Sequence, residues 1–133
     1  MMKVKGLMID DWVKLDGSNY QVQVIKKKGV IKLYENTKYG EHEIELNTDW
    51  IEEFIEPIPL TEEILKKNGF LEDSNGIFYL KENLKFGFKK DIDYGCWFIN
   101  RADNYKEYIC TCDSVHELQH ILKLQQIEKE IIL

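Results

Sequence analysis

The residues of this sequence with the clearest chemical potential are two histidines and a glutamate near its C-terminus. They lie in the run His116-Glu117-Leu118-Gln119-His120, which matches the H-E-x-x-H motif of zinc metallopeptidases. On a helix, this spacing places the two imidazoles one turn apart on the same face. Both can then bind one Zn²⁺ ion while the glutamate activates a bound water. The motif therefore raises the possibility of a zinc cofactor, with Glu117 as the catalytic residue.

The sequence around the motif does not complete a catalytic zinc site. Such a site needs a third protein ligand, and Lys123 and Gln126 occupy the positions where the extended metzincin motif has glycine and histidine. On a helical wheel, His116 and His120 lie opposite an apolar face, which is typical of a solvated helix surface. We therefore expect no catalytic residue, no metal ligand and no cofactor here, and we keep the zinc peptidase as an alternative.

Two cysteines upstream of the histidines suggest a second kind of zinc site. Cys110 and Cys112 precede His116 and His120 in a C-x-C-x3-H-x3-H pattern. The histidine spacing suits zinc, but the cysteine spacing is tighter than usual. In a strand, both thiols would lie on the same face. Because free cysteine is among the most buried residue types, we favour two buried thiols over a structural zinc site.

A separate group of residues could contact an anionic ligand. Lys89, Lys90 and Arg101 supply positive charge, and Tyr94 and Trp97 supply aromatic rings on or beside neighbouring predicted strands. Such rings can stack on a base while the cations bind a phosphate. The more ordinary interpretation is that the aromatic residues form the core of the sheet. If the protein sequesters a nucleotide-like signal molecule, these five residues are the predicted contacts.

The composition of the 133-residue chain limits the classes of partner. Lys and Arg number 18 against 24 Asp and Glu, which gives a formal net charge of −6. An acidic chain lacks the positive field that drives non-specific binding to nucleic acid or anionic membrane. We therefore expect no membrane partner and disfavour nucleic acid. The three cysteines, an odd number, fit a reducing compartment, so the expected location is the cytoplasm.

Short extended segments separated by tight turns fill the chain up to residue 58. The clearest runs from Tyr20 to Val24 and alternates apolar and polar residues, as a half-buried strand does. Four or five such strands predict a small SH3-like β-barrel. Pro57 and Pro59 bias the residues before them toward extended geometry and mark the end of this part. We expect two subdomains, 1–58 and 59–133, or one compact unit.

A short, well-marked helix follows the prolines. Thr61 stands at its predicted N-cap, and Gly69 stands at its predicted C′ position, where a positive φ is common. Phe70 is expected to pack back on Leu65 in a Schellman motif. These start and stop signals predict a helix between Thr61 and Gly69.

An antiparallel meander and a last helix are predicted for the rest of the chain. The strands are expected over residues 77–80, 84–88, 96–99 and 105–110. Asp113 or Ser114 would cap a helix that runs to about Gln126, and residues 130–133 would finish as an edge strand. The fold class is therefore α+β: an SH3-like β-barrel followed by a helix, an antiparallel β-meander and a C-terminal helix.

Several runs of the sequence are similar to those of a known set of proteins. They are Asp11-Trp-Val13, Ile55-Glu-Pro-Ile-Pro-Leu-Thr-Glu-Glu63, Asn68-Gly-Phe70 and Ser114-Val-His-Glu-Leu-Gln119. Together they resemble uncharacterised small proteins of gut Bacteroides-type bacteria and their phages. In that set the closing motif is Val-His-x-Leu-Gln, which leaves out Glu117 and His120. The resemblance implies a cytoplasmic accessory protein of a phage or mobile element, and it implies no activity or cofactor.

We therefore predict a non-enzymatic binding or interaction module that acts on a host protein or sequesters a small anionic ligand. A zinc-dependent peptidase that uses His116, Glu117 and His120 is the first alternative, and a structural protein is the second. No oligomeric state is predicted.

Overall fold

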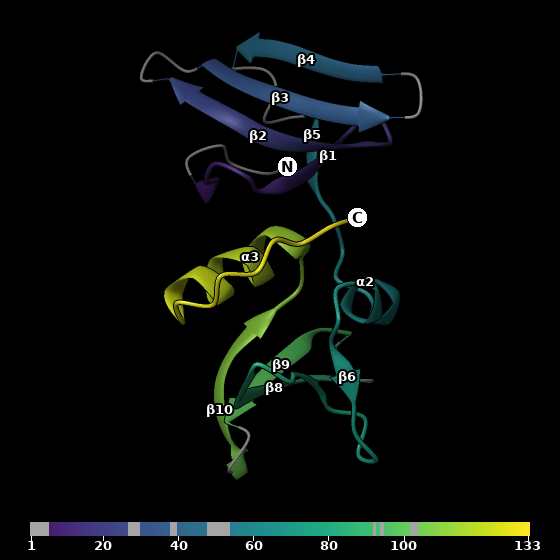
Figure 1. Ribbon diagram of the computed structural model, residues 1–133, viewed down its shortest axis with the longest axis vertical. Helices are drawn as coiled ribbons and strands as arrows, with labels where there is room; N and C mark the ends of the chain where they lie inside the picture. The colour runs from purple at the N-terminus through teal and green to yellow at the C-terminus, as the bar shows by residue number, and fades with distance from the viewer. Residues whose placement is uncertain are drawn as a thin grey trace. The chain divides into compact units, whose positions relative to one another are not determined.

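The computed structural model describes residues 6–26, 30–37, 40–47, 54–91, 93, 95–101 and 104–133, without the side chains of some strand residues, Arg101 among them (Figure 1). The chain divides into two compact units, Met1–Ile58 and Pro59–Leu133. Each unit contains a five-stranded antiparallel sheet, and the described part of the second also contains two helices. The predicted α+β class is confirmed.

The sheet of the first unit is a meander with a short returning strand. Its strands, in the order β4-β3-β2-β1-β5, are β1 (Trp12–Leu15), β2 (Ser18–Lys26), β3 (Val30–Thr37), β4 (Gly40–Asn47) and β5 (Ile55–Pro57). β5 returns to pair with β1, where Val13 lies opposite Pro57. No pairing joins the edge strands β4 and β5 among the described residues, so closure of a barrel stays a prediction.

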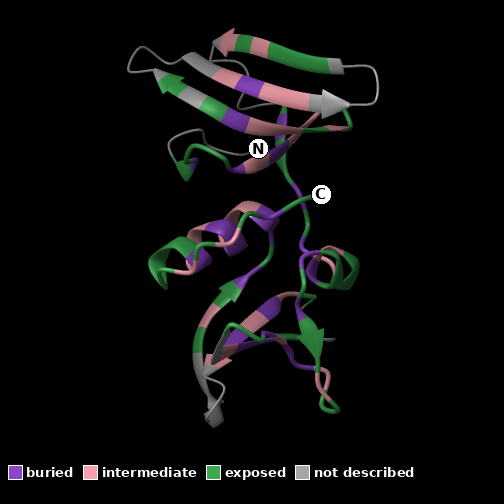
Figure 2. Ribbon diagram, in the orientation of Figure 1, coloured by how far each residue is buried: buried purple, intermediate pink, exposed green. Residues whose placement is uncertain are grey.

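A small apolar core supports this first sheet. Its buried residues are Leu7, Val13, Val22, Leu33 and Ile55, which belong to the purple segments of the first unit in Figure 2. Tyr20 packs against the same core from β2, two residues before the fully buried Val22. Tyr20 and Val22 therefore face the core as predicted, because side chains two residues apart share a face. The pairing of β2 with β3 shifts register between Val22 and Val24, and the side chain of Val24 lies outside the described residues.

The second unit has its helices on one side of its sheet. Figure 1 shows α2 (Glu62–Lys67) and α3 (Val115–Leu124) on the same side of the strands. The strand order is β10-β9-β8-β7-β6, with β6 (Leu71–Glu72), β7 (Phe78–Leu80), β8 (Asn83–Lys90), β9 (Trp97–Arg101) and β10 (Asn104–Cys112). The predicted succession of helix, meander and helix is confirmed. The two-residue β6 was not predicted, because so short a strand leaves no periodic pattern.

The ends of α2 follow from local sequence. The Thr61 hydroxyl accepts a hydrogen bond from the Ile64 N–H at 3.3 Å, which confirms the N-cap. Gly69 has φ +85°, and the Phe70 N–H donates to the Leu65 carbonyl at 3.0 Å. This is the predicted Schellman motif, in which the C″ residue closes the last turn of the helix.

The C-terminal segment differs from its prediction. Residues 127–133 form no strand, although Ile131 is buried. The backbone of Ile132 is held instead by the side-chain amide of Asn68. Because one side chain satisfies both backbone groups of Ile132, this segment needs no neighbouring strand there. Neither described helix is long and apolar enough to cross a membrane.

Candidate functional site

The glutamate of the His-Glu-Leu-Gln-His motif is engaged at the start of α3. Ser114 is the N-cap, and its hydroxyl accepts from the Glu117 N–H at 3.4 Å and donates to Glu117 Oε1 at 3.0 Å. The other carboxylate oxygen, Oε2, accepts from the Asp113 N–H at 3.4 Å. This arrangement resembles a capping box, in which a glutamate reaches back to the helix start. The carboxylate of Glu117 is therefore engaged in capping α3.

The two histidines lie together as the motif predicts. The rings of His116 and His120 are half-buried on α3, with centroids 5.7 Å apart and an interplanar angle of 80°. Nδ1 of His116 lies 3.0 Å from the Ser114 hydroxyl oxygen. Val115, Leu118 and Leu122 are buried on the helix. The helix and its predicted apolar face are thereby confirmed for these residues.

The two cysteines of β10 share a face, with Cys112 buried and Cys110 half-buried. Cys110 lies opposite Ile99 and Cys112 opposite Trp97 across the β9–β10 pair. Cys112 is fully buried, and burial raises the pKa of both thiols above their ordinary value. Since the thiolate is the metal ligand, this burial works against zinc binding. The described residues include no group of three or more His, Cys, Asp or Glu side chains placed to hold a metal ion.

Trp97 is part of the core and not of a ligand surface. Its side chain is 1% exposed, and its indole N–H donates to the Leu60 carbonyl at 2.9 Å. Its ring packs edge-on against Phe78 with centroids 5.6 Å apart. Because no face of the indole is open to a ligand, the predicted stacking role of Trp97 is corrected to a core role.

Of the other predicted ligand contacts, Lys89 and Lys90 do not form one surface with Trp97. Lys89 and Lys90 are both exposed, but they are neighbours on β8 and so leave opposite faces of the strand. Lys89 pairs with Phe98, and Lys90 pairs with Trp97. Tyr94 lies outside the described residues. The side chain of Arg101 is also outside them, although its backbone pairs with Phe86.

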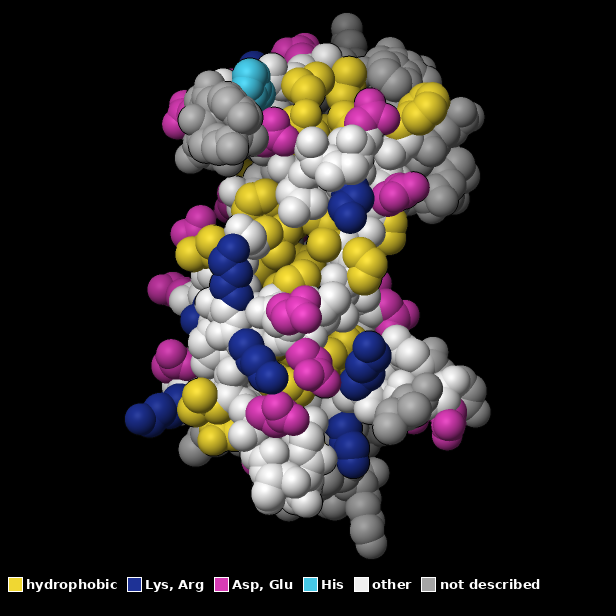
Figure 3. All heavy atoms as spheres, turned by 90° about the vertical axis from the view of Figure 1, so that its right-hand side faces the viewer, with side chains coloured by type: hydrophobic (Ala, Val, Ile, Leu, Met, Phe, Trp, Pro, Cys, Tyr) yellow, Lys and Arg dark blue, Asp and Glu magenta, His cyan; other side chains and the backbone are white. Residues whose placement is uncertain are grey.

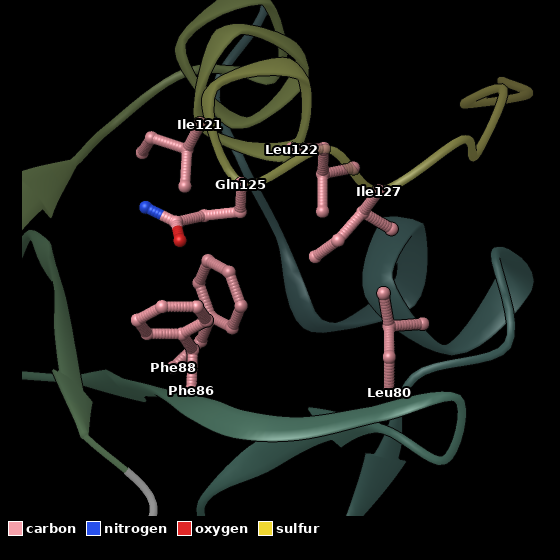
Figure 4. Close-up of a pocket in the computed structure, with 7 residues that line it drawn as sticks. All are labelled: Leu80, Phe86, Phe88, Ile121, Leu122, Gln125 and Ile127. Carbon is pink, nitrogen blue, oxygen red and sulfur yellow. The ribbon is translucent and has the colours of Figure 1, made fainter.

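A small apolar hollow lies under α3 in the second unit (Figure 4). Its cavity volume is about 10 Å³, roughly the least that holds one water and far below the ~300 Å³ of ordinary ligand pockets. It is lined by Leu80, Phe86, Phe88, Ile121, Leu122, Gln125 and Ile127. No local sequence pattern predicts this hollow, because α3 and the strands that line it are distant in the chain. Its size suits a packing defect better than a small-molecule site.

The β4 strand is the most distinctive surface of the first unit. In the described part of the chain it pairs with β3 alone, over all eight of its residues. Glu41, Glu43 and Glu45 alternate along it and are exposed, while Leu46 packs on the core from the opposite face. The place of these carboxylates at a sheet edge could not be predicted from the sequence, because strand order depends on contacts distant in the chain.

One lysine of β3 forms ion pairs with two of these carboxylates. Lys32 Nζ lies 3.0 Å from Glu43 Oε1 and 3.8 Å from Glu45 Oε2, and its hydrogen bond with Glu43 raises the pKa of Lys32. A hydrogen bond with Glu41 raises the pKa of the neighbouring Tyr34 hydroxyl. Lys32 therefore pairs with Glu43 and Glu45, and Glu41 is bonded to the Tyr34 hydroxyl.

No protein-family model, curated protein or solved structure matches the chain. The functional assignment therefore depends on the geometry of its own residues.

Proposed function

We propose that the protein is a non-enzymatic interaction module that binds an extended segment of another protein along β4. The observation that carries this proposal is the eight-residue edge strand, which pairs with β3 on one side alone among the described residues. A partner strand can add to such an edge through main-chain hydrogen bonds, while side chains at alternate positions give specificity.

The charge of β4 defines the chemistry of the partner. Glu41, Glu43 and Glu45 repeat every second residue, and Lys32 offsets only part of their charge. An added strand with Lys or Arg at alternate positions would place a cation beside each carboxylate. Two copies of the same acidic edge would repel each other, since charge on an edge strand opposes self-pairing. The favoured occupant is therefore a basic segment of a different protein.

Other observations favour a protein partner over a small anionic ligand. Trp97 is buried, and Lys89 and Lys90 leave opposite faces of β8, which argues against a nucleotide site that uses these three residues together. Figure 3 shows basic and acidic side chains interspersed over the second unit on the face that it draws. The engagement of Glu117 at the start of α3 also removes the main reason to propose a peptidase.

The context of the interaction is also a proposal. In the phage or mobile-element setting that the sequence resemblance implies, the partner of β4 would be a host protein in the cytoplasm. We further propose that the first unit is an SH3-like barrel. The four-strand meander and the return of β5 to β1 support this assignment.

The proposal is tested with a short fluorescent peptide of alternating Lys and Val. We expect saturable binding that weakens as salt rises. The double substitution Glu43→Gln and Glu45→Gln should weaken it by at least about tenfold. The matched control, Glu62→Gln with Glu63→Gln, removes the same charge from the exposed first turn of α2 and should leave binding almost unchanged. Equal weakening by both pairs would overturn a site at β4.

Backbone methylation separates strand addition from simple charge attraction. Successive N–H groups of an added strand point alternately toward and away from its neighbour. We therefore compare two peptides, one N-methylated at its odd-numbered residues and one at its even-numbered residues. We expect one of them to lose binding and the other to keep it. Equal binding by both methylated peptides would contradict strand addition.

A further inference from the structure

We infer that His116 and His120 form a two-histidine site for a borderline divalent transition-metal ion such as Cu²⁺ or Zn²⁺. The inference does not depend on the binding role proposed for β4. Their ring centroids are 5.7 Å apart, and two imidazoles on one tetrahedral zinc ion have ring centres roughly 5 Å apart, given Zn–N bonds of about 2 Å. The two rings are therefore close to the separation that one shared ion requires.

The hydrogen bonds around Ser114 assign the tautomer of His116. The Ser114 hydroxyl has one proton, and it donates that proton to Glu117 Oε1 at 3.0 Å. The same oxygen lies 3.0 Å from His116 Nδ1, so Nδ1 carries the proton and donates to Ser114. The lone pair of the ring is therefore on Nε2, which is the nitrogen that binds the metal.

The hydrogen bonds between Glu117 and Ser114 and between Ser114 and His116 position the ring of His116. Metal-binding histidines commonly donate their second ring N–H to an acceptor that fixes the orientation of the ring. Here the acceptor is Ser114, which is 2% exposed and is itself anchored by Glu117. The glutamate of the motif thus acts through Ser114 on the orientation of His116, and it does not act as a base.

The site binds its ion in a readily exchanged form. The described residues provide no group of three metal-ligating side chains, so water completes the coordination. Two imidazoles favour Cu²⁺ over Zn²⁺, as expected from the Irving–Williams order. The ion also links two positions one turn apart, so its binding stabilises the folded helix.

Isothermal titration of the full chain with Cu²⁺ and with Zn²⁺, each in a non-chelating buffer, tests the site. We expect one ion per chain, with tighter binding of Cu²⁺. His116→Ala and His120→Ala should each weaken binding by at least about tenfold, and circular dichroism should show that both variants stay folded. His42→Ala, which removes the exposed histidine of β4, is the matched control and should bind normally. Unchanged binding in a folded double variant of His116 and His120, or no binding of either ion, would overturn the inference.

The positioning role has its own test. Ser114→Ala should weaken Zn²⁺ binding by about tenfold and change the tautomer of His116, which is read from imidazole ¹⁵N chemical shifts. Ser114→Thr keeps the hydroxyl and should restore both properties. A purely structural cap would lower stability without changing the tautomer. An unchanged tautomer in Ser114→Ala would therefore contradict the positioning role.

Discussion

The side-chain amide of Asn68 holds the backbone of Ile132 through two hydrogen bonds, although the two residues are 64 positions apart. Nδ2 donates to the Ile132 carbonyl at 2.8 Å, and Oδ1 accepts from the Ile132 N–H at 2.7 Å. Nδ2 also donates to the Ile64 carbonyl at 2.8 Å. One side chain thus joins the end of α2 to the C-terminal segment.

Asn68→Ala should destabilise the second unit by about 2 to 3 kcal/mol, because it removes three hydrogen bonds of a nearly buried amide. Urea unfolding measures the loss, and faster digestion by carboxypeptidase reports release of the C-terminal segment. Asn75→Ala in an exposed turn is the control and should change little. An unchanged unfolding midpoint for Asn68→Ala would show that these bonds contribute no net stability.

Trp97→Phe should destabilise the second unit by about 2 to 4 kcal/mol. The substitution leaves a void beside Phe78 and removes the donor to the Leu60 carbonyl. Chemical denaturation measures the change. A variant as stable as the parent protein would contradict the core role of this indole.

Gly69→Ala should cost about 1 to 2 kcal/mol, because φ is +85° at this position and an L-residue with a Cβ atom is strained there. The added methyl group would meet only the Lys129 amino group, at an ordinary 3.5 Å, so the cost comes from the backbone. Gly6→Ala is the control, since its Cβ would meet no atom of the described residues within 4 Å. Thermal unfolding of both variants should separate them, and equal melting temperatures would refute the argument.

Alkaline pH should destabilise the second unit through Cys112. Burial raises the pKa of this thiol above its ordinary value of 9.0, so the folded protein holds the proton more tightly than the unfolded chain does. Below pH 9, this thiol therefore does not change the free energy of unfolding. Above pH 9, it lowers the free energy of unfolding by up to about 1.4 kcal/mol per pH unit. Urea unfolding across this range should show a shallower decline for Cys112→Ala. The same decline in both proteins would assign the effect to other groups.

The features that were predictable from sequence are those whose signal is local. Thr61 and Gly69 mark the ends of α2 through backbone geometry that nearby residues determine. The capping role of Glu117 was also predictable, because Ser114 and Glu117 have the spacing of a capping box. Lys89 and Lys90, by contrast, follow the strand predicted over residues 84–88, and the structure extends that strand to Lys90 and so places them on opposite faces.

The features that were not predictable depend on contacts between distant parts of the chain. The burial of Trp97 follows from its contacts with Phe78 and Leu60, and no local pattern distinguishes a core indole from an exposed one. The C-terminal segment looked like a strand because its apolar residues suit one. The amide of Asn68 supplies the hydrogen bonds that a neighbouring strand would have supplied.

The burial of Trp97 also makes it an optical reporter. The chain has three tryptophans; Trp12 is half-buried in the first unit, Trp50 lies outside the described residues, and Trp97 is enclosed in the second. An enclosed indole emits at shorter wavelength than a hydrated one. The emission of Trp97 should therefore shift to longer wavelength when the second unit unfolds. Trp97 is therefore an intrinsic fluorophore for the opening of the second unit.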